Sequence, residues 1–369
     1  MAGTSARDHD PALGLLRVLR EDGRTDPATD PFLAPETLLA MYKEMRRSRA
    51  LDTALIERQR SGRIGFWSAA LGQEAVAVGA VFALDAADWV FPTHRETSAL
   101  LCRGVSVTRV VSQAFGTGED PLHGRQTPGH GSSRSALVAS PPGAVGTQLP
   151  QAVGVAMAAK RRGSRIAVLA FVGDGGTSTP DFHSAMNFAG VFRAPCIVVC
   201  QNNQVAVSTG TAAQTASSTF AVKGHAYGVP GVRVDGTDVL AVHRAIAEAR
   251  VRAVAGAGPT LVECVTRRAS PYVAAGAEPD PAAAPTEIEG DPIGRFQRHL
   301  EYIGALDAEA EASIVAVVTA EVDAAIAHAE ASAPPDRETL FDDVYAARPW
   351  NLVEQAGRAD PLSGVDSSV

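Results

Sequence analysis

Residues 166–176 read IAVLAFVGDGG, and residues 196–205 read CIVVCQNNQV. Each segment begins with an uninterrupted apolar run of strand length, which is typical of a parallel strand buried on both faces. Glycine and polar residues follow directly where each run ends. Because open α/β sheets bind ligands at the carboxyl ends of their strands, these segments predict a parallel sheet with a ligand site at that edge.

The residues after the two apolar runs suit a magnesium ion that carries a diphosphate. Asp174 and Asn203 supply a carboxylate and an amide oxygen, and the backbone carbonyl of Val205 is a third donor. Magnesium takes a few ligands from protein and the others from phosphate and water. Gly173 and Gly175 allow close approach to a phosphate because they have no Cβ. Either polar tripeptide alone is typical of a tight turn, but the pair favours the metal site.

The chain as a whole predicts one large domain with an extension at each end. Its 369 residues are 46% hydrophobic, which is enough for a substantial core. Alternating strands and helices over residues 35–333 indicate a doubly wound, mostly parallel α/β domain. Residues 1–34 predict an arm that is poorly ordered alone or lies on a partner, and residues 334–369 predict an extended tail that needs a partner surface.

Hydrophobic periodicity gives the remaining elements. The arm is expected to enter the domain through a helix from Pro35 to Arg60, so the architecture begins with a helical N-terminal arm. Further helices are expected over residues 72–83, 152–160, 182–190, 237–254 and 306–331, and further strands over residues 88–91, 229–234 and 260–266.

Composition excludes several classes of protein. Forty-one acidic residues against 33 basic ones give a net charge of −8, and the basic residues are scattered, which argues against nucleic acid. No window is apolar over the roughly 18 residues that a membrane helix needs, because Arg, Asp or Gly interrupts the longest candidates. The sequence MAGTSARDHDP at the N-terminus has no apolar core and is not a secretory signal. A cytoplasmic protein without a membrane partner is expected.

The two segments resemble the thiamine diphosphate motif. More narrowly, the chain resembles the alpha subunit of the decarboxylating component of 2-oxo acid dehydrogenase complexes, of the branched-chain and pyruvate types. Many separate blocks in one order argue against a chance resemblance. These blocks are residues 71–75 (LGQEA), 89–92 (WVFP), 95–96 (RE), 124–126 (GRQ), 147–151 (TQLPQ), 181–183 (DFH), 187–189 (NFA), 232–236 (VRVDG) and 341–345 (FDDVY).

The resemblance implies an enzyme that works only as part of an assembly. In this family thiamine diphosphate and magnesium lie between an alpha and a beta subunit, and the carboxylate that activates the cofactor belongs to beta. The chain alone is therefore expected to be inactive and to form an alpha2-beta2 heterotetramer. Its substrate would be a small 2-oxo acid, and the acyl group would pass to lipoamide on a lipoyl-bearing acyltransferase.

Family roles carry over to individual residues of this chain. Asp174, Asn203 and the carbonyl of Val205 resemble the magnesium ligands, and Arg95 resembles the arginine that binds the diphosphate. Guanidinium gives bidentate, permanently charged donors to phosphate, so lysine would be a poor substitute at position 95. The residues that would line the diphosphate are Gly173, Gly175 and Gly176.

Four further positions have weaker counterparts in the family. Val145 corresponds to the apolar residue that contacts the aminopyrimidine ring of the cofactor. Phe66 falls where the family places an aromatic residue in the substrate pocket, although aromatic residues are more often simply part of a core. Thr147 and Gln148 resemble ligands of a structural potassium ion, and their position at a helix start explains them nearly as well.

The loop after the strand at residues 260–266 departs from the family. The family carries histidines there that serve decarboxylation and acyl transfer, and this chain has none. Arg268 stays in register, but Tyr272 occupies the histidine's place, and a phenol with an ordinary pKa near 10 is a weak proton shuttle at neutral pH. His94 replaces the tyrosine that usually precedes the diphosphate arginine. The candidate catalytic residues are therefore His94, Arg268 and Tyr272.

This departure leaves three interpretations open. The enzyme transfers the acyl group through another residue, such as His94 or a histidine of beta; it passes its intermediate to a different acceptor, as acyloin-forming relatives do; or it is a catalytically weak structural paralogue. A branched-chain substrate is the first expectation, because residues 124–126, 150–154 and 340–355 look closer to that type. Pyruvate is the leading alternative, since one methylene is worth only about 1 to 3 kcal/mol in a pocket.

Overall fold

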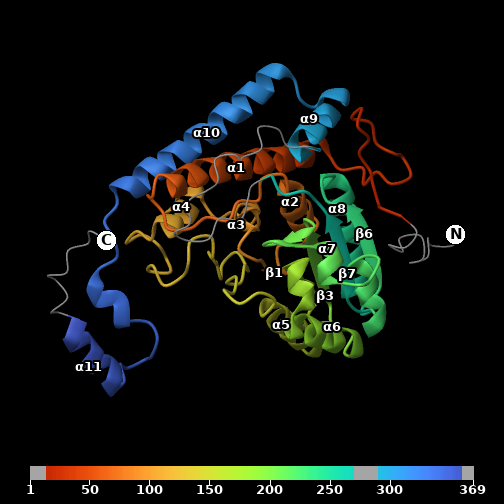
Figure 1. The fold of residues 1–369 in the computed structure, drawn as a ribbon. Coiled ribbons are helices and arrows are strands. Elements are labelled where there is room, and N and C mark those ends of the chain that lie inside the picture. Colours follow the sequence, from red (N-terminus) through yellow and green to blue (C-terminus); the bar gives the residue numbers. More distant parts are fainter. Residues whose placement is uncertain (1–13, 270–289, 360–369) are drawn as a thin grey trace.

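A five-stranded sheet, in which all strands are parallel, lies at the centre of the molecule (Figure 1). The computed structural model describes residues 14–269 and 290–359. Within them the sheet has the predicted doubly wound α/β character. In spatial order its strands are β1 (Trp89–Phe91), β2 (Val168–Gly173), β3 (Cys196–Asn202), β7 (Thr260–Val265) and β6 (Gly231–Asp235).

Helices cover both faces of this sheet. On one face α5 (Gln148–Arg161) and α6 (Pro180–Val191) pack together, and on the other α8 (Val239–Val254) lies on the strands. Behind α8 come α2 (Glu74–Phe82) and the long α1 (Pro35–Arg60). The arrangement gives each strand two buried faces, as the continuous apolar runs predicted.

Alternate residues of each strand enter two different cores. In β2, Leu169 and Phe171 point into the larger core with α1, α2 and α8, whereas Val168, Ala170 and Val172 point into the smaller core under α5 and α6. All five are fully buried. Successive side chains of a strand face opposite sides, so an uninterrupted apolar run is what a sheet between two helical layers requires.

Several helices were not predicted, and some boundaries differ. The unpredicted helices include α3 (Thr97–Cys102), α4 (Val107–Phe115) and α9 (Pro292–Tyr302). Helix α5 starts at Gln148, four residues earlier than expected, because Pro150 lies in its first turn, where proline is tolerated. The other predicted elements are present, with ends that shift by a few residues.

Helix α10 (Ala308–Ala331) runs along α1 and α4 at the top of Figure 1. Within the described residues, α10 is the one helix that is long and apolar enough to cross a membrane. Glu321 and Asp323 interrupt this helix, so it is apolar on average and is not the uninterrupted apolar window that the sequence analysis excluded. One such helix is weak evidence for a span, since core helices of soluble proteins have the same length and composition. A stripe that includes Val322, Ala325 and Ile326 is buried against the larger core.

Both extensions differ from the sequence expectation. The described part of the N-terminal arm, residues 14–34, has no helix; it lies on its own domain, where Leu16 bridges to Val234 of β6 and Val18 and Leu19 are buried. The C-terminal tail is not extended throughout, because it forms a 3-10 turn, η5 (Arg337–Phe341), and a helix, α11 (Trp350–Ala359).

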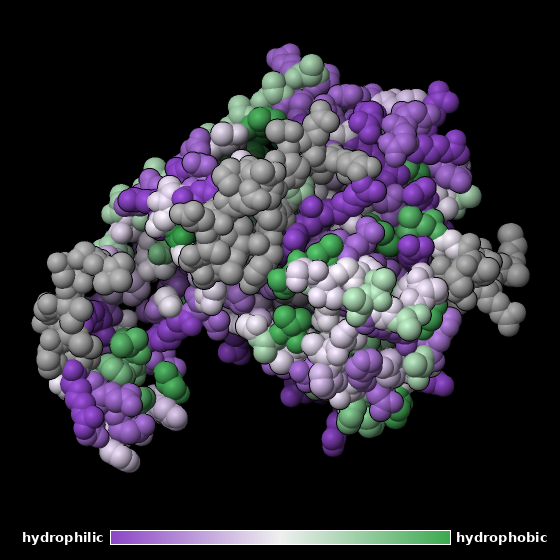
Figure 2. Space-filling model, in the orientation of Figure 1, coloured by the Kyte–Doolittle hydropathy of each residue, from purple (hydrophilic) through white to green (hydrophobic). Residues whose placement is uncertain are grey.

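Figure 2 shows the tail standing apart from the body at the lower left, with green hydrophobic residues beside purple hydrophilic ones. Its exposed apolar side chains are Leu340, Val344, Tyr345, Trp350 and Val353.

Candidate functional site at the carboxyl edge of the sheet

Strand pairing brings the two predicted metal ligands to one edge of the sheet. Gly173 at the end of β2 pairs with Gln201 near the end of β3, so Asp174 and Asn203 both follow directly at the carboxyl ends of neighbouring strands. Adjacent strands lie about 4.8 Å apart, which places the two residues within reach of one ion. After β3 the chain makes a short hairpin of β4 (Val205–Ala206) and β5 (Thr209–Gly210).

Asp174 is a buried carboxylate. Its side chain is 3% exposed, and Oδ2 accepts a 2.7 Å hydrogen bond from Nε2 of Gln214 in α7 (Thr211–Gln214). Burial raises the pKa of Asp174, although the hydrogen bond from Gln214 and the positive charge of Arg268 oppose the rise. Among the described residues, no Lys, Arg or His side chain lies within 4.0 Å of the Asp174 carboxylate as an ion-pair partner. A buried carboxylate of this kind suits a bound cation.

Asn203 is oriented by two hydrogen bonds. Its Nδ2 donates to Oε1 of Gln73 at 3.2 Å, and its Oδ1 accepts from the backbone N–H of Val205 at 3.3 Å. The two contacts assign the nitrogen and oxygen ends of the amide. Val205 is 38% exposed at the start of the hairpin.

Glycines shape the turn between the two ligands. A Cβ on Gly175 would lie 2.5 Å from Cβ of Ala206, and one on Gly176 would lie 2.5 Å from Cγ2 of Val172, so any side chain at either position would force the turn to shift. A Cβ on Gly173 would meet nothing within 4 Å, so space is open beside that backbone. Val145, which is 54% exposed, lies next to Gly176.

The donor set fits a magnesium diphosphate better than a bare metal ion. Within the described residues, no three His, Cys, Asp or Glu side chains gather as a metal site. One carboxylate, one amide and open space beside glycine backbone instead suit an ion whose remaining oxygens come from a ligand and water. The residues that are present therefore fit the group that the sequence predicts.

Arg95 lies in the loop after β1 and is 9% exposed. Its Nη1 donates to the carbonyl of Ala69 at 2.6 Å. The buried Asp52 of α1 holds this neighbouring segment in place, because its carboxylate accepts from Nε1 of Trp67 and the N–H of Ala70, each at 2.8 Å. Burial raises the pKa of Asp52 to about 7.

The segment that Asp52 holds also contains Phe66, which is half-buried. Arg95 contacts the segment that follows Phe66, because it donates to Ala69, so the two residues lie in one packed region of the structure.

The remaining predicted residues have different surroundings in the structure. Arg268 lies near enough to Asp174 for the two charges to interact. Thr147 donates to the carbonyl of Ala144, and Gln148 donates to the carbonyl of Phe171 at 2.7 Å. Oε1 of Gln148 is buried without a hydrogen-bond partner among the described residues. Tyr272 lies outside the described residues.

Sequence analysis missed three residues that organise this edge. Gln73 and Gln214 hold Asn203 and Asp174 through hydrogen bonds, and Asp52 holds Trp67 and Ala70 in the segment beside Arg95. Gln73 belongs to the LGQEA block, which was noted only as part of a resemblance. Gln214 and Asp52 carry no sequence signal, because their partners are 40 and 15 or more residues away along the chain.

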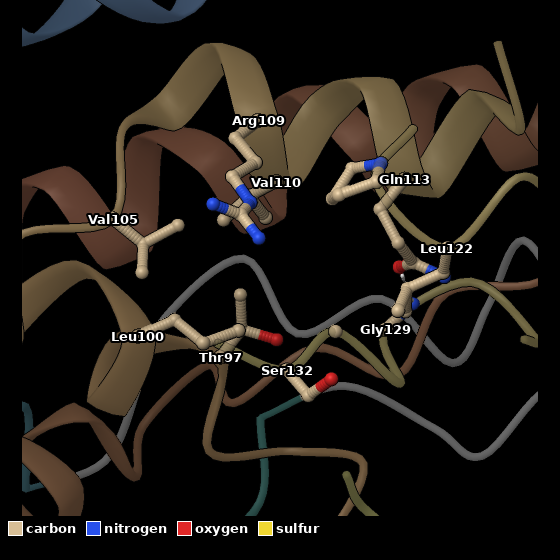
Figure 3. Close-up of a pocket in the computed structure, with 11 residues that line it drawn as sticks. Thr97, Leu100, Val105, Arg109, Val110, Gln113, Leu122, Gly129 and Ser132 are labelled. Carbon is tan, nitrogen blue, oxygen red and sulfur yellow. Dashed lines mark hydrogen bonds between the residues drawn. The ribbon is translucent and has the colours of Figure 1, made fainter. Parts of the chain in front are cut away.

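A separate hollow lies between α3, α4 and residues 121–132 (Figure 3). Apolar residues such as Leu100, Val105 and Val110 line it, with the guanidinium of Arg109 directed towards it. None of the predicted site residues lines this hollow. It is therefore distinct from the site at the sheet edge.

The fold and the edge residues define an α/β enzyme domain whose ligand site lies at the carboxyl ends of parallel strands. The family model described as dehydrogenase E1 component matches residues 42–338. Relatives named pyruvate dehydrogenase E1 component subunit alpha, from Staphylococcus aureus (strain Mu50) and Staphylococcus epidermidis (strain RP62A), are each 36% identical over 346 residues. These matches cover 92% of this chain and 91% of each relative.

The chain therefore belongs to the dehydrogenase E1 component family, as an alpha subunit of the thiamine diphosphate-dependent enzymes that act on 2-oxo acids. This confirms the resemblance found in the sequence. The branched-chain expectation gains no support from these relatives, whose names carry the pyruvate alternative instead.

Proposed function

We propose that this chain is the alpha subunit of a pyruvate dehydrogenase-type E1 component. It would decarboxylate pyruvate oxidatively and pass the acyl group to lipoamide on an acyltransferase, jointly with a beta subunit. The observation that carries the proposal is the buried carboxylate of Asp174 beside Asn203 at adjacent strand ends. The names of the relatives supply the substrate.

When bound, thiamine diphosphate supplies the electron sink that a 2-oxo acid needs in order to lose carbon dioxide. Asp174, Asn203 and the carbonyl of Val205 would hold the magnesium ion. Arg95 would bind the diphosphate, and Gly173, Gly175 and Gly176 would let it approach the backbone. Because Asp174 and Arg95 are both buried, their charges act in a medium of low polarity, where they attract a ligand more strongly than in water.

A beta subunit is proposed to cover this edge of the sheet. Val145, Val205 and Val207 are 54%, 38% and 68% exposed around the site, which is unusual for apolar residues beside a buried carboxylate. A second chain would bury them and complete the site in an alpha2-beta2 heterotetramer. A structural potassium ion near Thr147 and a cytoplasmic location stay predictions from the sequence.

A branched-chain 2-oxo acid is the second candidate substrate. It rests on the sequence blocks at residues 124–126, 150–154 and 340–355. The two substrates differ by a few carbon atoms, and a pocket distinguishes such differences by about 1 to 3 kcal/mol per methylene. Rates on the two acids should therefore differ by tenfold or more, in favour of pyruvate if the first proposal holds.

The test uses this chain co-expressed with the beta subunit encoded next to it. Calorimetric titration of thiamine diphosphate with magnesium is expected to show binding, and dye reduction should then follow with pyruvate or 2-oxoisovalerate. The Asp174→Ala variant should bind the cofactor more than about 100-fold more weakly, because it loses the one carboxylate of the donor set. An Asp323→Ala variant on the exposed face of α10 serves as the matched control.

Three outcomes separate the interpretations. If the assembled wild-type complex does not bind the cofactor, the proposal is wrong. If it binds but does not turn over either acid, the chain is the weak structural paralogue. If Asp174→Ala binds as well as Asp323→Ala does, the assignment of the metal ligand is wrong.

A further inference from the structure

Gln73 immediately precedes helix α2 and lies beneath the sheet edge where the candidate site is built. It is the residue before Glu74, at the start of the helix, and its side chain is 1% exposed. The side chain reaches the ends of both β3 and β7, because its hydrogen-bond partners follow those two strands. Gln73 is thus 128 residues or more from each partner along the chain.

Three donors converge on a single atom of this side chain. Oε1 of Gln73 accepts from Nε2 of Gln201 at 3.0 Å, from Nδ2 of Asn203 at 3.2 Å and from Oγ1 of Thr266 at 3.4 Å. The backbone N–H of Val205 can only donate, so Oδ1 of Asn203 faces it and Nδ2 of Asn203 faces Gln73. An amide nitrogen of Gln73 would meet this Nδ2 donor to donor, so the atom at the centre is oxygen.

Gln73 and the N–H of Val205 hold the Asn203 amide from its two ends. If the Asn203 amide rotated by 180°, its oxygen would face Oε1 of Gln73 and its nitrogen would face the N–H of Val205, so both contacts would become repulsive. The observed orientation engages the nitrogen with Gln73 and keeps Oδ1 on the other side. That oxygen is the atom which the proposed magnesium ion requires.

We propose that Gln73 is a positioning residue that holds the amide oxygen of Asn203 towards the metal-diphosphate site. This inference rests on the proposed function, and Gln73 acts only through Asn203. Residues that orient metal ligands in this way typically change metal affinity by about 10- to 100-fold when they are replaced.

The arrangement has an energetic cost that packing alone does not require. Nε2 of Gln73 and Oε1 of Gln201 are both buried without a hydrogen-bond partner among the described residues. Each such group costs about 1 to 3 kcal/mol, and apolar side chains of similar shape would avoid that cost. A polar network retained in spite of this cost is better explained by what it orients than by the stability it provides.

The test measures the affinity of Mn2+ in the presence of thiamine diphosphate by electron paramagnetic resonance, on the full chain assembled with its beta subunit. Gln73→Met, which has nearly the same shape but no acceptor, is expected to weaken Mn2+ binding by about 10- to 100-fold. Gln73→Glu, which keeps an acceptor oxygen at the same place, should restore most of the affinity. Thr266→Val removes a different donor of the same oxygen and should leave the affinity within about threefold.

A second background separates orientation from a general loss of structure. In Asn203→Asp the two side-chain oxygens are equivalent, so no amide orientation has to be held, and adding Gln73→Met should not weaken Mn2+ binding further. If Gln73→Met does not fold, Gln73→Asn serves instead. Its side chain is one methylene shorter, so its amide oxygen lies farther from Asn203, and the affinity for Mn2+ should again fall.

The outcomes distinguish this inference from the proposed function. If the wild-type assembly binds no Mn2+ with thiamine diphosphate, the proposed function fails. If the wild type binds but Gln73→Met and Gln73→Asn bind equally well, the positioning role is wrong. The positioning role is also wrong if Gln73→Met lowers the Mn2+ affinity equally in the wild-type and Asn203→Asp backgrounds. The effect would then not act through the amide of Asn203.

Discussion

His94 is a neutral imidazole in the folded chain. Burial lowers its pKa to about 3, and the positive charges of Arg95 and His130 add to the effect. The ring lies 6.1 Å from that of His130, centroid to centroid, in a stacked arrangement. An imidazole that stays unprotonated throughout the neutral range can accept a proton but is a poor acid, so the proposed role of His94 in place of the loop histidine would be that of a base.

The His94 resonance is expected not to titrate between pH 8 and pH 5 in histidine-labelled NMR spectra of the folded chain. The unfolded chain should titrate near 6.5. Because the folded pKa is depressed, the unfolded state takes up a proton first as the pH falls below 6.5, and the folded state loses stability from there towards pH 3. A His94→Gln variant identifies the resonance. A midpoint between pH 6 and 7 in the folded chain would contradict the assignment.

At the scale of single elements, the contact between α2 and α8 depends on one glycine. A Cβ on Gly79, in the middle of α2, would lie 2.7 Å from the backbone carbonyl oxygen of Val239, where α8 begins. Backbone cannot move aside as a flexible side chain can. Gly154 in α5 is also within a helix, but a Cβ there would meet nothing within 4 Å.

These two glycines give a matched pair of substitutions. Gly154→Ala should stabilise the chain by about 0.5 to 1 kcal/mol, because alanine favours the helix. Gly79→Ala gains the same helix propensity but should destabilise the chain by about 1 to 3 kcal/mol, because the new methyl group overlaps the backbone of α8. Urea unfolding followed by circular dichroism measures both. Equal stability of the two variants would mean that α2 and α8 do not pack as closely as described.

At the scale of the whole molecule, a buried ion-pair network ties the N-terminal segment to the domain. Arg295 of α9 bonds Asp235 at 2.9 Å and lies 3.7 Å from Asp238, the residue that caps α8. Oδ2 of Asp238 in turn accepts from the backbone N–H groups of Val18 and Leu19 at 2.7 and 2.6 Å. One cluster therefore connects β6, α8, α9 and the segment before α1.

Arg295→Met should destabilise the folded chain by about 3 to 5 kcal/mol, because it removes the buried cation that the carboxylates of Asp235 and Asp238 share. Although burial by itself raises the pKa of Asp235, hydrogen bonds from Thr237 and Arg295 lower it overall. The stability that ionised Asp235 contributes is therefore present above the ordinary aspartate pKa near 4. It is lost as the pH falls below that value. Thermal unfolding from pH 7 to pH 3 should show this acid loss in the wild type and a weaker one in Arg295→Met.

The control is Arg17→Met, since Arg17 contacts the same Asp235 at 3.1 Å but its side chain is 64% exposed. Solvent screens that pair, so its loss should cost less than about 1 kcal/mol. Comparable losses for the two variants would show that burial of Arg295 does not set the strength of the network.

The sequence by itself determined the sheet and the candidate ligands. Continuous apolar runs such as residues 166–172 have no other stable place than between two helical layers, and this local pattern sufficed to predict β2, β3 and the edge that carries Asp174 and Asn203. It predicted the family for the same reason, since motifs of consecutive residues are visible in one dimension.

Only the tertiary structure decided how those ligands are held. Gln73 meets Asn203 across 130 residues, Gln214 meets Asp174 across 40, and Leu19 meets Asp238 across 219. No periodicity or local propensity encodes such pairs, because they arise when strands and helices pack. The same reason explains why residues 14–34 looked like a free arm: they are rich in charged residues and contain prolines, and their place on β6 depends on backbone hydrogen bonds to a buried aspartate.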